Sequence, residues 1–144
     1  MTSLTSVSPF GTETVADAMT HGVIRCSPDT PLRTVARIMA GHRVHAIYVF
    51  DYGDEDDETV ALWGLVSDLD VVAAADADLD RITARDSAVS PLVTIASSDS
   101  LANAAHSMAE TGVSHLAVVD PLTRRPTGVL STLDVVRQLA DGGR

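Results

Sequence analysis

The fold is decided by a stretch that occurs twice in this chain of 144 residues, first as Gly64-Leu65-Val66-Ser67-Asp68-Leu69-Asp70 and again as Gly128-Val129-Leu130-Ser131-Thr132-Leu133-Asp134. In both versions an apolar run ends at a serine, and an aspartate follows three residues later. A serine can cap the first turn of a helix, so this order predicts a strand that ends where a helix begins. The two versions lie 64 residues apart and predict the same strand-to-helix junction in two copies.

The similarity continues towards the N-terminus, where equivalent residues lie 69 rather than 64 apart. The matching pairs are Asp17 and Asp86, Leu32 and Leu101, Ala36 and Ala105, Met39 and Met108, and Val44 and Val113. The change of spacing places five additional residues in the first copy, within the acidic segment 51–58. Closure entropy grows slowly with loop length, so we expect residues 54–58 to form a solvated hairpin tip. Two copies are too few for a solenoid, which favours two halves that bury their faces against each other.

Each copy predicts the same order of elements. A helical turn (residues 15–19; 85–89) precedes a short strand (23–26; 92–95), and an amphipathic helix follows. Two more strands come next (46–50 and 60–66; 116–119 and 127–130), and a last helix opens at the serine of the repeated stretch. This alternation is typical of an α+β protein built as an α/β sandwich, with helices on one side of a small sheet.

The two amphipathic helices carry recognisable boundary signals. Thr30 is expected to cap the first helix, with Pro31 at its first position, and Asp99 to cap the second. Gly41 and Gly112 are expected to end the two helices.

Composition excludes several function classes. The chain has 20 acidic residues against 10 basic ones, and its net charge of -10 would repel nucleic acids and anionic membranes. Every basic residue is arginine, so neither a Schiff-base lysine nor a phosphate-loop lysine is available. Aromatic residues make up 3% of the chain, too few for a base-stacking surface. No stretch approaches the roughly 20 apolar residues that cross a bilayer.

The single cysteine, Cys26, permits neither an intrachain disulfide nor a multi-cysteine zinc site. It lies in a predicted apolar strand, where a small buried side chain is the expected role. A reducing compartment suits this cysteine usage, and no secretory signal is visible, so we expect a cytoplasmic protein.

No motif for catalysis or metal binding stands out. The Gly-x-Ser-x-Gly elbow, the His-Glu-x-x-His helix and the phosphate loop are absent from the sequence. His42 and His45 are three residues apart but have no third ligand spaced with them, while His21 and His106 are expected to be solvated or to cap helices. We therefore expect no enzyme activity, no metal and no resident cofactor, with an unrecognised hydrolase as the alternative.

The repeated strings resemble a tandem pair of cystathionine-β-synthase (CBS) domains, the arrangement known as a Bateman module. They are Val15-Ala16-Asp17-Ala18-Met19, Ser27-Pro28-Asp29-Thr30-Pro31-Leu32, Gly112-Val113-Ser114-His115-Leu116-Ala117-Val118-Val119-Asp120 and the two stretches quoted first. The resemblance implies an N-terminal tail (1–13), a first CBS repeat (14–75), a linker (76–83) and a second repeat (84–141). It also implies two β-α-β-β-α repeats packed with pseudo-two-fold symmetry.

A CBS pair of this kind implies two clefts that bind an adenosine-containing ligand, such as AMP, ATP or S-adenosylmethionine, for a regulatory purpose. In each cleft the repeated stretch of one copy meets the first strands of the other copy, and its aspartate holds the ribose. One cleft would use Leu65, Ser67, Asp70, Leu92, Val93, Ser114 and His115. The other would use Val129, Ser131, Asp134, Val23, Ile24, His45 and Ala46.

Two features leave alternatives open. The Ser-x-x-Asp string is also a helix capping box, which needs no ligand. Where many relatives present arginine to phosphates, this chain has His45-Ala46 and Ser114-His115, which disfavours a triphosphate. A monophosphate, a nucleoside-like ligand such as S-adenosylmethionine or an empty site remains. Arg25 and Arg43 either replace the missing arginine or are solvated.

The resemblance further implies a homodimer that signals to a separate effector protein. The amphipathic helices that carry Leu32–Ala40 and Leu101–Met108 can form the dimer contact, unless their apolar faces are internal. The alternative function is a dimeric structural or interaction module that needs no ligand.

Overall fold

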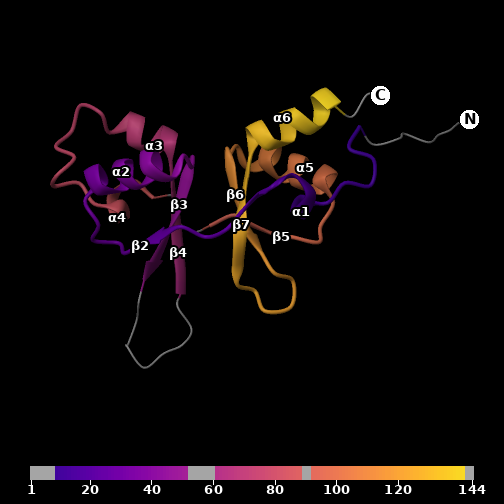
Figure 1. Ribbon diagram of the computed structural model, residues 1–144, viewed down its shortest axis with the longest axis horizontal. Coiled ribbons are helices and arrows are strands. Elements are labelled where there is room, and N and C mark those ends of the chain that lie inside the picture. The colour runs from indigo at the N-terminus through magenta and orange to yellow at the C-terminus, as the bar shows by residue number, and fades with distance from the viewer. Residues whose placement is uncertain (1–8, 52–60, 89–91, 142–144) are drawn as a thin grey trace, which may run out of the picture. The chain divides into compact units, whose positions relative to one another are not determined.

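The structure is a computed structural model that describes residues 9–51, 61–88 and 92–141. The chain separates into two compact units (Figure 1). Unit 1 consists of residues 1–22 and 93–144, and unit 2 consists of residues 23–92. The class is mixed α/β, as predicted.

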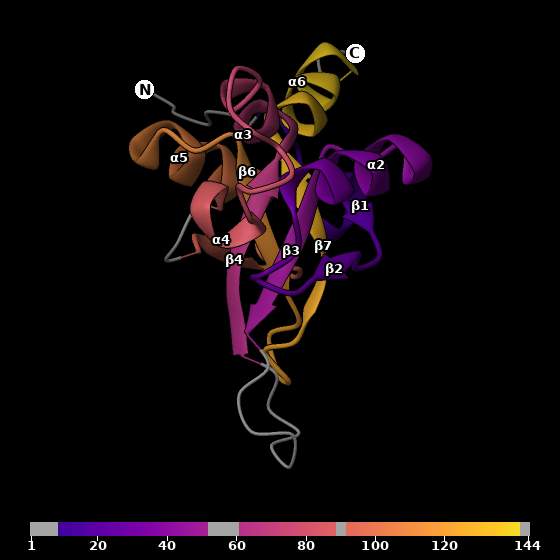
Figure 2. The ribbon, with the colours of Figure 1, turned by 90° about the vertical axis from the view of Figure 1, so that its left-hand side faces the viewer.

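Unit 2 contains β2 (Arg25–Cys26), α2 (Leu32–His42), β3 (Ala46–Asp51), β4 (Ala61–Ser67), α3 (Asp68–Ala73) and α4 (Ala84–Ser87). Its sheet has the order β2-β3-β4, with β2 parallel to β3 and β3 antiparallel to β4 (Figure 2). The core lies between the sheet and the helices α2 and α4. Its buried members are Cys26, Leu32, Val35, Met39, Ile47, Val49, Val66 and Ala84.

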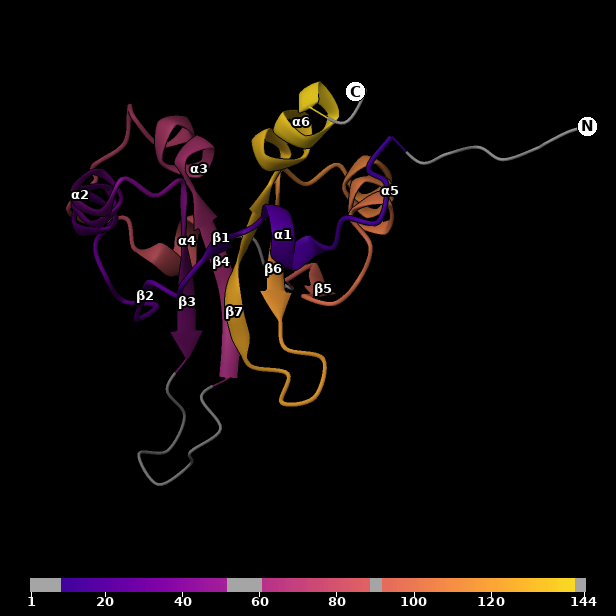
Figure 3. The same cartoon turned by 45° about the vertical axis from the view of Figure 1, so that its right-hand side comes forward.

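Unit 1 contains α1 (Val15–Ala18), β1 (Thr20–His21), β5 (Thr94–Ala96), α5 (Leu101–Thr111), β6 (His115–Val119), β7 (Pro126–Ser131) and α6 (Thr132–Asp141). Its sheet has the order β1-β7-β6-β5, and α1 lies against α5 (Figure 3). The buried core members are Phe10, Val15, Met19, Ile95, Leu101, Ala104, Met108, Leu116, Val118, Leu130 and Val135.

The predicted β-α-β-β-α order is confirmed in both copies, as β2-α2-β3-β4-α3 and as β5-α5-β6-β7-α6. The first strand of each copy is shorter than predicted, and only Arg25–Cys26 and Thr94–Ala96 are paired. The expected hairpin tip at residues 54–58 and the end of the predicted turn at residue 89 lie outside the described residues.

The boundaries of the two compact units differ from those of the sequence repeats, because each unit includes a short segment of the other repeat. The start of the first copy belongs to unit 1, where Val15 is fully buried and its N–H donates to the carbonyl of Asp99. The start of the second copy belongs to unit 2, where Ala84 is fully buried and its N–H donates to the carbonyl of Thr30. Each unit is therefore assembled from parts of both repeats.

The segment between the copies packs on α2 within unit 2. The N–H of Leu32 donates to the carbonyl of Ile82 at 2.8 Å, and the side chains of Arg33 and Asp80 form an ion pair at 2.6 Å. The N–H of Arg33 donates to the carbonyl of Leu79. Residues 76–83 therefore supply the first turn of α2 with hydrogen-bond acceptors that a free tether would not offer.

Three predicted helix boundaries are wrong. Pro31, not Thr30, occupies the cap position of α2, and the Thr30 hydroxyl bonds the Ser27 hydroxyl instead. The cap of α5 is Ser100, whose hydroxyl accepts the N–H of Asn103 at 3.1 Å.

Gly112 ends α5 in the left-handed conformation, as predicted, but Gly41 does not end α2. That helix continues to His42, and Arg43 takes the left-handed position with φ of 55°. Glycine usually holds such a position because a side chain is strained there, so the pattern pointed to the nearest glycine.

The apolar faces of α2 and α5 are internal, which was the alternative to a dimer contact. Leu32, Val35 and Met39 are buried in the core of unit 2. Leu101 and Met108 are buried in the core of unit 1. The exposed large apolar residues on helices belong to α3 and α6 instead, namely Leu69, Val72, Leu133, Val136 and Leu139.

Among the described residues, no helix is both long enough and apolar enough to cross a bilayer.

Candidate functional site

The first candidate site residue pair, Ser67 and Asp70, forms the junction between β4 and α3. The Oδ2 atom of Asp70 accepts the backbone N–H of Ser67 at 2.8 Å and the Ser67 hydroxyl at 3.0 Å. In return the Ser67 Oγ accepts the N–H of Asp70 at 3.2 Å. The pair is thus a reciprocal capping box that ties the last residue of the strand to the first turn of the helix.

The second pair, Ser131 and Asp134, forms the same junction between β7 and α6. Asp134 Oδ2 accepts the N–H of Ser131 at 2.8 Å, and Ser131 Oγ accepts the N–H of Asp134 at 3.2 Å. Asp134 is only 8% exposed, and its Oδ1 lies 3.8 Å from Nη1 of Arg137. The carboxylate is therefore held in place by the backbone of the preceding strand.

The capping interpretation of the Ser-x-x-Asp string is confirmed. Two further boxes of the same kind occur at Thr14–Asp17 and Thr83–Asp86, at the starts of α1 and α4. Each box uses only the Oδ2 atom of its aspartate. In the described part of the chain, Oδ1 of Asp70 and Oδ1 of Asp134 accept no hydrogen bond, so capping leaves one oxygen of each carboxylate for another partner.

Several other predicted site residues gather around the start of α3. The register of β3 and β4 pairs Ala46 with Ser67, and the N–H of Asp68 donates to the carbonyl of His45 at 2.7 Å. The His45 Nδ1 lies 3.0 Å from Oδ2 of Asp68, and both side chains are exposed. On the same sheet, Tyr48 pairs with Leu65 and donates its N–H to the carbonyl of Ile24 at 2.9 Å.

An equivalent group surrounds the start of α6. The register of β6 and β7 pairs His115 with Ser131, and the N–H of Thr132 donates to the carbonyl of Ser114 at 2.9 Å. The Ser114 hydroxyl lies 2.9 Å from Nδ1 of His115. Further along the sheet, Ala117 pairs with Val129 and donates its N–H to the carbonyl of Val93 at 3.0 Å.

The predicted site residues thus form two groups, one in each unit. Unit 2 holds Val23, Ile24, His45, Ala46, Leu65, Ser67, Asp70 and Leu92. Unit 1 holds Val93, Ser114, His115, Val129, Ser131 and Asp134. The predicted clefts combine residues of the two units, and that combination stays a prediction.

The remaining candidates have structural partners. His42 is the last residue of α2 and His45 precedes β3, and the described residues contain no group of three or more potential metal ligands. His21 Nε2 bonds the carbonyl of Ala16, and His106 pairs with Glu110. Cys26 is buried in β2, as expected, and burial raises the pKa of its thiol.

The two arginines considered as phosphate ligands differ in role. Arg25 places its guanidinium 5.4 Å from the centre of the Phe50 ring, a cation–π contact on the sheet of unit 2. Arg43 forms the left-handed end of α2. Neither arginine has an ion pair among the described residues.

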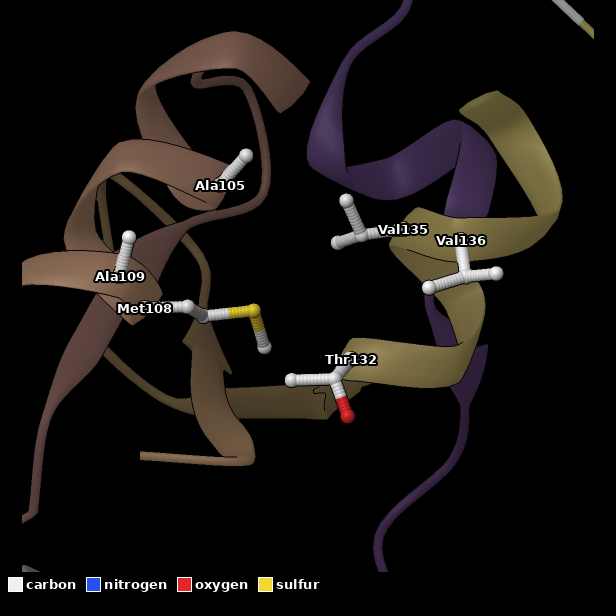
Figure 4. A pocket seen from close by; sticks show the side chains of 6 residues that line it. All are labelled: Ala105, Met108, Ala109, Thr132, Val135 and Val136. Carbon is white, nitrogen blue, oxygen red and sulfur yellow. The ribbon is translucent and has the colours of Figure 1, made fainter. Parts of the chain in front are cut away.

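The sequence interpretation missed an apolar pocket between α5 and α6 in unit 1 (Figure 4). Its volume is about 250 Å³, and its lining is Ala105, Met108, Ala109, Thr132, Val135 and Val136. The residues that α6 contributes to it are Thr132, Val135 and Val136, which lie three and four positions apart and so share one helical face.

Comparison with known proteins agrees with the repeated fold. The sequence matches the CBS domain twice, over residues 15–77 and 84–141. No curated protein sequence matches.

Solved structures match over nearly the whole chain. The CBS domain pair of protein MJ0100, in complex with 5′-methylthioadenosine and S-adenosyl-L-methionine, is 19% identical, with a TM-score of 0.74 over 90% of this chain and 97% of that one. CBSX2 in complex with AMP is 26% identical, with a TM-score of 0.64 over 91% and 98%. The hexameric CBS-CP12 protein from bloom-forming cyanobacteria is 17% identical, with a TM-score of 0.74 over 87% and 67%.

The two family matches together span most of the chain and coincide with the two β-α-β-β-α copies. The chain therefore belongs to the CBS domain family, as a tandem CBS domain pair.

Proposed function

We propose that this protein is a non-catalytic regulatory CBS pair that binds an adenosine-containing ligand through Asp70 and Asp134. One observation carries the proposal. Oδ2 of each carboxylate accepts the hydrogen bonds of its helix cap, whereas Oδ1 accepts no hydrogen bond in the described part of the chain. A ribose offers two adjacent hydroxyl donors, and hydrogen bonds to a charged acceptor are stronger than neutral ones. The ligands of the MJ0100 domain pair and of CBSX2 support this chemical class.

The surroundings of the two aspartates favour small ligands over a triphosphate. The residues just before the matching strands β3 and β6 are His45 and Ser114, and neither offers the bidentate fork of an arginine. The proposed ligands are therefore a nucleoside monophosphate such as AMP, or a nucleoside thioether or sulfonium such as S-adenosylmethionine. No resident cofactor is proposed.

Calorimetry of the full chain tests the proposal, with AMP, ATP, 5′-methylthioadenosine and S-adenosylmethionine as probes. Asp70→Asn and Asp134→Asn keep the shape of the cap but remove the charge that the ribose would meet. We expect each to weaken binding at its own site by about tenfold or more, the usual effect of losing a charge-assisted hydrogen bond.

Asp86→Asn is the matched control, since Thr83 and Asp86 form the same capping box at α4. It should reduce stability as the other two variants do, while leaving ligand affinity within about twofold of the wild type. The proposal is wrong if none of the four compounds binds, or if Asp86→Asn weakens binding as much as Asp70→Asn.

We also propose that the protein forms a homodimer and passes its signal to a separate effector protein. The exposed apolar residues on α3 and α6 supply the dimer contact, because water-exposed valine and leucine side chains gain free energy on burial. The oligomeric CBS-CP12 relative supports an assembly of this kind. The single buried cysteine suits the reducing cytoplasm as the site of action.

The second candidate function is a structural or interaction module that needs no ligand. It is favoured by one observation, that all four Ser/Thr-Asp boxes are complete without a ligand. The calorimetric experiment separates the two candidates, because a purely structural module would bind none of the probes.

A further inference from the structure

The two proposed aspartate sites carry different charges at equivalent positions. The residue that follows the capping serine is Asp68 in the first copy and Thr132 in the second, 64 residues later. Asp68 is ionisable and exposed, and its Oδ1 accepts the N–H of Leu69 at 2.8 Å. Thr132 is exposed and has a neutral hydroxyl. The start of α3 therefore has a second carboxylate that the start of α6 lacks.

A second difference lies one helical turn further on. Arg137 of α6 places Nη1 3.8 Å from Oδ1 of Asp134, and its side chain is largely exposed. The equivalent position in α3, 64 residues earlier, is Ala73. The aspartate of the second copy thus has a cation beside its free oxygen, whereas Asp70 has none among the described residues.

The remaining titratable neighbours do not remove this contrast. At the start of α3, Nδ1 of His45 lies 3.0 Å from Oδ2 of Asp68, so this imidazole faces that carboxylate. At the start of α6, His115 faces the hydroxyl of Ser114. Apart from these imidazoles, the described residues place two carboxylates, Asp68 and Asp70, at the start of α3, and one carboxylate and one guanidinium, Asp134 and Arg137, at the start of α6.

We infer that the two sites select different adenosine ligands according to the charge on the 5′ substituent. The Asp134 site takes a nucleoside monophosphate, and the Asp70 site takes a neutral or cationic nucleoside thioether or sulfonium. The inference rests on the proposed function, since it needs each aspartate to hold a ribose. The 5′ substituent is attached to that same ribose, so it lies close enough for Asp68 or Arg137 to act on its charge.

Asp68, Thr132 and Arg137 determine this specificity, and a reciprocal exchange at the Asp68 and Thr132 positions tests it. The probes are AMP and 5′-methylthioadenosine, which share adenosine and differ in the charge at the 5′ position. In the otherwise wild-type full chain, Asp134→Asn should weaken the binding of AMP about tenfold or more, and Asp70→Asn should weaken the binding of 5′-methylthioadenosine to the same extent. Each variant should leave the other probe within about twofold of its original affinity.

Thr132→Asp should weaken AMP about tenfold or more, while 5′-methylthioadenosine stays within about twofold. An acidic residue in the first helical turn stabilises the helix, so this variant should remain folded, with a melting temperature no lower than that of the wild type. Asp68→Thr should create AMP binding at the Asp70 site, seen as a second equivalent of AMP bound per chain.

The outcomes separate the inference from the proposed function. If AMP and 5′-methylthioadenosine both bind but neither Thr132→Asp nor Asp68→Thr alters their affinity ratio, the inferred selection by charge is wrong. The proposed adenosine-binding function then still stands. The same conclusion follows if both probes compete for one site in the wild type. If neither probe binds, and neither ATP nor S-adenosylmethionine binds in the calorimetric test above, the proposed function itself fails.

Discussion

Gly128 of β7 lies directly against the backbone of Thr20 in β1, and a Cβ atom built on Gly128 would overlap the Thr20 carbonyl oxygen. The same hypothetical atom would approach Sδ of Met19 at 3.3 Å. The two strands pair in antiparallel register, Thr20 with Val129 and His21 with Gly128. This close approach is what allows a segment from the start of the first copy to complete the sheet of unit 1.

Gly128→Ala should therefore displace β1 from the sheet. Backbone atoms cannot rotate away as a side chain can, so we expect a loss of about 1–3 kcal/mol in the free energy of unfolding. Urea denaturation followed by circular dichroism measures this loss of stability.

Gly41→Ala is the control, because Gly41 lies inside α2 with nothing within 4 Å of its Cβ position. That variant should gain about 0.5–1 kcal/mol. Equal effects of the two substitutions would contradict the packing of β1 on Gly128.

The ends of α2 and α5 give a second prediction. Arg43 adopts φ of 55° and Gly112 adopts φ of 70°, so equivalent left-handed positions hold an arginine in one helix and a glycine in the other. A side chain there costs about 1–2 kcal/mol, while glycine loses about 0.4–1 kcal/mol through the entropy of the unfolded chain. Arg43→Gly should thus stabilise the protein slightly, and Gly112→Ala should destabilise it by about 1 kcal/mol. Thermal and urea unfolding of both variants measures the pair, and a stabilising Gly112→Ala would be inconsistent with the left-handed cap.

How far the sequence predicts this fold depends on whether the signal is local. The junctions at Ser67 and Ser131 could be predicted because one residue caps the helix that it begins, and an aspartate three positions later completes the box. The order of elements could be predicted for the same reason, since apolar periodicity reports which residues a single element buries. The aspartates of the candidate site are part of these local patterns.

The rest depends on contacts between distant segments. The sequence around Val15 does not indicate that this residue packs in the same core as Leu101 rather than with residues of its own repeat. Both repeats present an apolar surface of similar composition. The cap of α2 could not be found from Thr30 because the carbonyls of Ile82 and Leu79 supply the acceptors for the first turn. The exposure of Val136 depends on which other segments pack on α6, and the local sequence does not report this.

Cys26 provides a test of the core of unit 2. Its thiol is buried in β2, and burial raises its pKa because the thiolate would lose solvation. Alkylation needs the thiolate, so iodoacetamide at neutral pH should modify Cys26 far more slowly in the folded protein than in urea. Mass spectrometry of the alkylated fraction over time gives both rates. Equal rates under the two conditions would show that this strand is open to solvent.

The contribution of the turn after β6 to the stability of the fold should depend on pH. The Asp120 carboxylate accepts the N–H groups of Thr123 at 2.9 Å and of Leu122 at 2.8 Å, and these bonds hold its pKa below the usual range, with the Thr123 N–H contributing most. A lowered pKa in the folded state means stability that is present above the ordinary aspartate pKa and is lost as pH falls through the folded value.

Asp120→Asn should consequently be less stable than the wild type at pH 7, and the difference should shrink as the pH falls below the ordinary aspartate pKa and through the lowered folded-state pKa. Urea unfolding at a series of pH values gives the two curves. Asp29→Asn serves as the control, since Asp29 is exposed and accepts no side-chain hydrogen bond among the described contacts. A constant difference between Asp120→Asn and the wild type at every pH would rule out the carboxylate as its source.

The exposed face of α6 leads to the last prediction, which concerns self-association. Val136 is 55% exposed, lines the pocket between α5 and α6 and shares its face with Leu133 and Leu139. Burial of a valine side chain contributes about 1.5–3 kcal/mol, so Val136→Asp should weaken a dimer formed through this face by tenfold or more. Sedimentation velocity over a range of concentrations measures the dissociation constant.

Leu122→Asp is the control. It introduces the same charge at a side chain that is 90% exposed in the turn after β6, away from any helix, and should leave the dimer intact. A wild-type protein that stays monomeric at all concentrations, or a Leu122→Asp variant that dissociates as readily as Val136→Asp, would exclude α6 as the dimer contact.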